Sequence, residues 1–137
     1  MFAAAMSDSS ISPSRSRLFP WARACAVAGF LAVALGAFGA HGLKDHLTAT
    51  GTMDWWNKAT HYHLAHAVVA LVALQWTRRR LPVILFLAGI LVFSGTLYTM
   101  AMTGQRWLGA ITPIGGMLLL AGWLSLCFIR PASPRVD

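Results

Sequence analysis

The sequence predicts an all-α, polytopic membrane protein: a bundle of four transmembrane helices with both termini in the cytoplasm. Of its 137 residues, 57% are hydrophobic and only 11% are charged, whereas about a quarter of the residues in a soluble domain are charged. The apolar residues gather in long segments, and lysines and arginines flank those segments. This combination is typical of a chain whose main solvent is the hydrocarbon of a bilayer.

The first apolar segment, residues 21–40, is long enough to cross a membrane, since about 20 residues at roughly 1.5 Å each match a hydrocarbon core of about 30 Å. Residues 1–20 contain serines and arginines without periodicity, so we expect a disordered cytoplasmic tail. A basic start before an apolar stretch is also typical of a signal peptide. This segment is long for one, and Phe38 stands three positions before the best cleavage point, after Ala40. We therefore favour an uncleaved anchor.

The second span, about residues 56–76, is the least apolar of the four. Residues 41–54 before it are polar and contain glycine, which predicts a loop with room for a short interfacial helix. Tryptophan favours both membrane interfaces. Trp55 and Trp56 stand at one end of this segment and Trp76 at the other, so the spacing predicts a full span.

Two further apolar segments, residues 81–102 and 108–129, complete the four predicted spans. Pro82 is tolerated in the first turn of a helix because the amide hydrogen that it lacks has no helical partner there. Thr112, followed by Pro113, is expected to cap or kink the start of the last span.

The distribution of basic residues predicts the orientation. Eight of the 11 lysines and arginines fall on one side of the predicted spans and three on the other. The side richer in these residues is cytoplasmic, so both termini, including the polar tail at residues 131–137, are predicted inside. The eight are Arg15, Arg17, Arg23, Arg78, Arg79, Arg80, Arg130 and Arg135, and the three are Lys44, Lys58 and Arg106.

The sequence contains no pattern typical of catalysis or of cofactor binding. It has no nucleophile next to a base, no carboxylate pair and no Gly-rich phosphate loop. We therefore expect that the protein is not an enzyme and binds no cofactor. Its two cysteines form no disulfide framework. The net charge of +7 comes from residues that flank apolar segments rather than from a basic patch, so nucleic acid is not an expected partner.

Polar side chains gather in the predicted outer half of the bundle. His66 lies near the expected midplane, where an ionisable group is costly and usually faces the bundle interior, so it is the leading site hypothesis. His63, three residues earlier, shares its helix face. The candidate polar pocket consists of His41, His63, His66, Thr96, Tyr98 and Thr112.

The alternative for His66 is a structural role. A neutral imidazole that hydrogen-bonds to a hydroxyl group of Thr96, Tyr98 or Thr112 would help helices to pack. A metal site would need three or four converging ligands. The three histidines of the candidate pocket supply them only if the helix ends converge, and we expect no metal.

Glycines recur at helical spacing in two of the predicted spans. Gly29 and Gly36 are seven residues apart, as are Gly115 and Gly122. Small residues let membrane helices approach closely, because packing rather than hydrophobic burial drives helix association in lipid. We expect these glycines to pack helices within the chain, with homodimerisation through one stripe as the alternative.

Four segments together resemble the small membrane proteins of domain-of-unknown-function family 423. The resemblance extends over about residues 23–129 and implies a four-helix inner-membrane protein of unknown function, with no catalytic residues to transfer. The chain departs from the family pattern at His63, where glutamine is common, whereas His41 and His66 fit it. The segments are GAFGAHGL (36–43), ATHYHLAHA (59–67), FSGTLYTMAMTG (93–104) and LGAITPIGGMLLLAGW (108–123).

These observations predict a small non-enzymatic accessory or structural protein of the bacterial inner membrane. Its expected partners are the lipid bilayer and either a second copy or another membrane protein. The alternative is a small-solute carrier or ligand-binding protein with an outward-facing polar pocket around His66. A proton-coupled carrier would have to use His66, because no predicted span contains a carboxylate. A third class is a metal- or haem-binding protein that uses the three histidines of the candidate pocket.

Overall fold

The structure, a computed structural model, describes residues 13–132, with side chains from Leu18 onward. Every regular element in this part of the chain is helical, which confirms the predicted all-α class. A short helix connects the first two long helices, and a 3-10 helix precedes the last. The elements are α1 (Pro13–Ala40), α2 (Lys44–Ala49), α3 (Met53–Thr77), α4 (Leu81–Thr103), η1 (Arg106–Ala110) and α5 (Thr112–Phe128).

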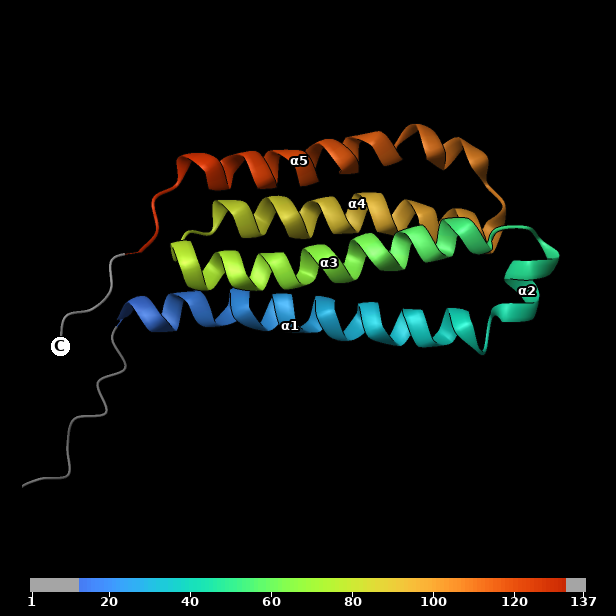
Figure 1. The fold of residues 1–137 in the computed structure, drawn as a ribbon, viewed down its shortest axis with the longest axis horizontal. Helices are drawn as coiled ribbons and strands as arrows, with labels where there is room; N and C mark the ends of the chain where they lie inside the picture. Colours follow the sequence, from blue (N-terminus) through green and yellow to red (C-terminus); the bar gives the residue numbers. More distant parts are fainter. Residues whose placement is uncertain (1–12, 133–137) are drawn as a thin grey trace, which may run out of the picture.

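The four long helices lie side by side as an open row in the order α1, α3, α4, α5 (Figure 1). α3 packs against α1 and α4, and α4 packs against α3 and α5, whereas α1 and α4 touch only slightly. The helices therefore do not enclose one common core, as a closed bundle would. Such a row leaves most of α1 and α5 exposed, which costs little in lipid because hydrocarbon tails are as apolar as the side chains.

Three segments of the described chain are long and apolar enough to cross a membrane: Leu18–Ala40, Leu81–Thr103 and Arg106–Phe128. Helix α3, which lies between the first two of these segments in the chain, has 25 residues, and each of the three segments has 23. Its first half contains polar residues such as Asn57 and Lys58, so its composition is less apolar.

Helix α1 begins at Pro13, earlier than the predicted start at residue 21. Residues 13–20 therefore belong to a helix and not to a disordered tail, while residues 1–12 lie outside the described part. Leu18 and Trp21 pack against the buried cluster near the end of α3. This packing stabilises a helical start that the Ser- and Arg-containing sequence does not predict.

The predicted fourth span, residues 108–129, is divided into η1 and α5. Pro113 lies in the first turn of α5, and its missing amide hydrogen prevents an α-helix from continuing through this point. Thr112 makes no capping bond. Its hydroxyl instead donates to the Leu108 carbonyl at 3.3 Å, so the Thr-Pro pair marks a kink and not a cap.

Glycines allow close contact between neighbouring helices. A Cβ atom at Gly115 would overlap the backbone nitrogen of Phe93, and one at Gly122 would lie 2.7 Å from Cε1 of Phe86. A Cβ at Gly36 would lie 3.1 Å from Cγ2 of Thr60. Three of the four glycines singled out in the sequence thus lie at contacts within the chain. The fourth, at position 29, has no atom within 4 Å of an added Cβ.

Candidate functional site

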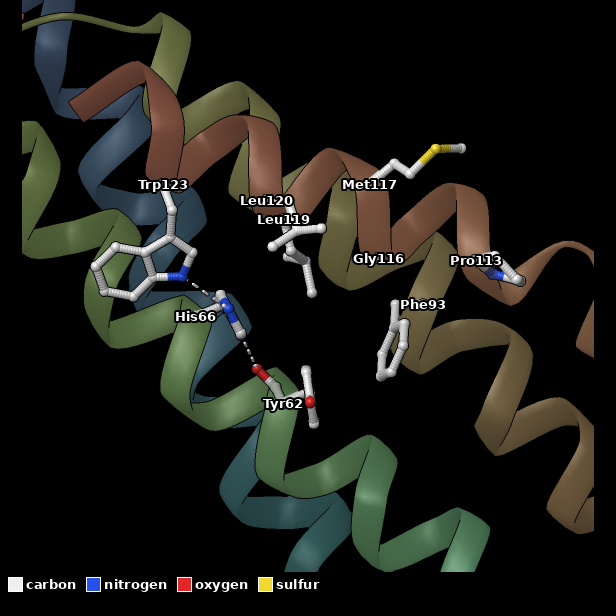
Figure 2. A pocket seen from close by; sticks show the side chains of 9 residues that line it. All are labelled: Tyr62, His66, Phe93, Pro113, Gly116, Met117, Leu119, Leu120 and Trp123. Carbon is white, nitrogen blue, oxygen red and sulfur yellow. Dashed lines mark hydrogen bonds between the residues drawn. The ribbon is translucent and has the colours of Figure 1, made fainter. Parts of the chain in front are cut away.

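A groove of about 450 Å³ lies between α3 and α5, with α4 beneath it (Figure 2). Tyr62 and His66 line it from α3 and Phe93 lines it from α4. The other lining residues come from α5, between Pro113 and Trp123. Apart from the imidazole, the indole nitrogen and one tyrosine hydroxyl, the lining side chains are apolar, so the groove suits hydrocarbon better than a polar solute.

The groove follows from the row of helices. α3 and α5 both pack on α4 but scarcely on each other. Their backbones therefore leave a space between them, and the side chains that border it form the walls of the groove. Gly115 brings the backbone of α5 onto Phe93, and its neighbour Gly116 faces the groove without a side chain. An added Cβ at Gly116 would lie 3.8 Å from Cδ2 of Phe93, an ordinary contact, so this position leaves real space.

His66 connects the two helices across the groove. Its Nδ1 donates to the Tyr62 carbonyl at 2.8 Å, and Nε1 of Trp123 donates to its Nε2 at 3.2 Å (Figure 2). A carbonyl only accepts and an indole only donates, so these partners assign a neutral imidazole with its hydrogen on Nδ1. Both nitrogens are engaged, which leaves no lone pair for a metal ion or a polar solute.

Aromatic rings close the groove at the His66 end. The rings of Phe86 and Trp123 meet edge to face, with centroids 5.7 Å apart, and the Phe86 and His66 centroids are 5.8 Å apart. Tyr62 stacks on His66 at 5.7 Å and packs against Phe93 at 4.6 Å. These contacts give the groove a rigid aromatic wall.

The hydroxyl groups predicted to join His66 are engaged elsewhere. Thr96 and Thr112 share a hydrogen bond of 2.8 Å between their Oγ1 atoms, which links α4 to α5. The Tyr98 hydroxyl donates to Oγ1 of Thr60 at 3.2 Å, which links α4 to α3. The partner of His66 is therefore an indole and not a hydroxyl, and the predicted pocket residues are distributed over separate helix contacts.

The other two histidines of the predicted pocket also lie apart from His66. His41 is exposed in the turn after α1. His63 is only 7% exposed, and its ring interacts with the backbone of Ala28 in α1. Three residues along a helix correspond to a separation of about 60° around the axis, which is enough to direct His63 and His66 to different neighbours. Nδ1 of His63 is buried and has no hydrogen-bond partner.

Replacing His63 with leucine is expected to change the free energy of unfolding by less than about 1 kcal/mol, or to raise it, because the substitution removes a buried nitrogen that has no partner. His66→Leu is the matched control. It deprives the Trp123 indole of its acceptor and is expected to cost about 1 kcal/mol. Reversible unfolding in mixed detergent micelles measures both. A loss above about 2 kcal/mol for His63→Leu would show that the interaction of its ring with the Ala28 backbone is essential for folding.

Within residues 13–132, no three His, Cys, Asp or Glu side chains lie close enough together to hold a metal ion.

The groove residues that were not predicted from the sequence include Tyr62, Phe93, Gly116 and Trp123. One signal was present. Trp123 lies well inside the last predicted span and not at an interface, where tryptophan is usual. An indole in hydrocarbon needs a hydrogen-bond acceptor, and in the structure His66 provides it.

The fold and the groove define the class: a small all-α membrane protein, with more than one helix able to cross a bilayer by length and composition. The chain belongs to the family described as "Protein of unknown function (DUF423)", whose profile matches residues 35–116. The family resemblance found in the sequence is thereby confirmed.

The chain is similar to several proteins named as membrane proteins. It is 43% identical over 108 residues to a "UPF0382 membrane protein" of Haemophilus influenzae, which covers 75% of this chain and 86% of that protein. It is 37% identical to YwdK of Bacillus subtilis (74% of this chain, 87% of that protein). It is 38% identical to the "UPF0382 inner membrane protein YgdD" of Escherichia coli (72% and 79%). No solved structure matches the chain.

Proposed function

We propose that this protein is a non-enzymatic accessory protein of the bacterial inner membrane that binds a lipid acyl chain in the groove between α3 and α5. The observation that carries this proposal is the groove itself, with a volume of about 450 Å³ and a largely apolar lining. Ligand sites typically have volumes of about 300–1,000 Å³ and mostly apolar walls.

In this proposal α3 is a fourth membrane span. Its 25 residues reach about 37 Å at 1.5 Å each, and it packs along α1 on one side and α4 on the other (Figure 1). Because both neighbours are apolar enough to cross the membrane, α3 shares their depth. The bias in lysine and arginine supports an orientation with both termini in the cytoplasm.

The engaged state of His66 supports an apolar ligand over a polar one. A polar solute would have to compete with Trp123 for Nε2 or with the Tyr62 carbonyl for the Nδ1 hydrogen. A hydrocarbon chain breaks neither bond and gains contact with the aromatic wall. A small-solute carrier has less support, because most of the predicted pocket's polar side chains are paired across helix contacts and do not line a common cavity.

The test is photocrosslinking in bilayers with a phospholipid that carries a diazirine on one acyl chain. Mass spectrometry should find labels on the groove residues Tyr62 and Phe93 several-fold more often than on Phe30, an exposed residue of α1. Gly116→Leu fills the groove and is expected to reduce groove labelling several-fold. Gly29→Leu, where an added side chain meets open space, is the matched control and should leave groove labelling unchanged.

The opposite result is equally clear. Equal labelling of Phe30 and the groove residues in the wild type, or unchanged labelling in Gly116→Leu, would mean that the groove meets only bulk lipid. The acyl-chain proposal would then fail.

A further inference from the structure

Among the side chains that the structure describes, the charged residues at one end of the row are all arginines. Here α1 and α4 begin and α3 and α5 end (Figure 1). Asp45 and Asp54, the acidic residues of the described chain, lie in α2 and in the first turn of α3, at the opposite end. Neither of these two carboxylates therefore lies near the arginines at this end. They are the exposed side chains of Arg23, Arg78, Arg79, Arg80 and Arg130.

Two connections bring part of this set together. Arg78 ends α3 in the left-handed conformation, with φ of 52°, and its amide donates to the Leu74 carbonyl at 2.9 Å. Oγ1 of Thr77 accepts a bond from the amide of Arg79 at 3.1 Å, which holds the turn tight. Both arginines thus lie in the short connection between α3 and α4.

The segment after α5 reaches back to the end of α3. The Ala132 amide donates to the Trp76 carbonyl at 2.9 Å. This bond brings Arg130, two residues earlier, toward the α3–α4 turn, although α3 and α5 scarcely touch elsewhere. Trp76 itself is 48% exposed and provides an aromatic surface at the same level.

The presence of arginine and not lysine at this end of the row indicates the kind of ligand. Both lysines of the chain, Lys44 and Lys58, lie toward the opposite end of the row. Guanidinium groups bind phosphate through two parallel hydrogen bonds, whereas an ammonium acts as a point charge. Basic residues at the cytoplasmic ends of membrane helices attract anionic headgroups, each contributing about 1 kcal/mol.

We propose that Arg78, Arg79 and Arg130 bind the phosphate of an anionic phospholipid headgroup in the cytoplasmic leaflet. This site is separate from the groove, whose lining includes none of these three arginines. Assignment to the cytoplasmic leaflet rests on the proposed orientation, whereas binding of the headgroup does not.

The test is native mass spectrometry of the delipidated full-length protein in mild detergent. Phosphatidylglycerol and phosphatidylcholine with identical acyl chains are added at equal concentration. The wild type is expected to retain phosphatidylglycerol at least fivefold better, and Arg78→Gln/Arg79→Gln/Arg130→Gln should lose most of that preference. The control, Lys44→Gln/Lys58→Gln/Arg106→Gln, removes the same charge from the other end and should keep the preference.

Further measurements make the result specific. Arg79→Gln/Arg130→Gln leaves the helix-capping residue intact and should still remove more than half of the preference, in case the triple variant folds poorly. Equal losses in the two triple variants, or no preference in the wild type, would overturn the site. Binding of water-soluble glycerol phosphate as tight as that of the lipid would overturn the assignment to a membrane headgroup.

Discussion

Replacing Phe86 with alanine is expected to lower the free energy of unfolding by about 3–5 kcal/mol. The Phe86 ring is completely buried, packs edge to face with Trp123 and lies against the backbone of Gly122. The ring is enclosed by neighbouring side chains, so its removal leaves a cavity in which the lost contacts are not replaced. Reversible unfolding in mixed detergent micelles measures the difference.

Leu91→Ala on the same helix is the control for this prediction. Leu91 is 75% exposed and faces lipid in the row arrangement. A lipid tail replaces the missing atoms there, so we expect a change below about 0.5 kcal/mol. Similar losses at Phe86 and Leu91 would contradict the assignment of buried and lipid-facing sides of α4.

The second large effect is expected from Gly115→Ala. The added methyl group would overlap the backbone nitrogen of Phe93, and a backbone atom cannot move aside as the end of a flexible side chain can. α5 must therefore shift away from α4, at a cost of about 1–3 kcal/mol or more. The shift would also strain the His66–Trp123 bond, so acyl-chain labelling of the groove should fall together with stability.

Gly116→Ala is the matched control, one position along the same helix. Its Cβ would lie 3.8 Å from the Phe93 ring, so we expect a change near zero or a small gain from the better helix propensity of alanine. If both alanines destabilised the protein equally, the cost would come from the loss of glycine as such, and the proposed close approach at Gly115 would be wrong.

Composition and periodic apolar segments were sufficient to predict an all-α membrane protein, because exclusion from water dominates where charge is scarce. The approximate positions of the long helices followed from the same rule. Their ends did not, and two cases show why. Helix α1 begins at Pro13, and Leu18 and Trp21 in its first part pack against the end of α3. At the other end of the chain, the α-helix begins only at Thr112, next to the proline.

The sequence by itself determined which side chains are polar and where each lies along its helix. Only the tertiary structure decided which of them meet. The angular position of each residue around its helix axis directs His66 toward Trp123, His63 toward α1 and Tyr98 toward Thr60. The groove likewise depends on the open row, in which α3 and α5 share α4 as a neighbour but not each other. Helix order and rotation arise from contacts between distant segments, which spacing along one helix does not encode.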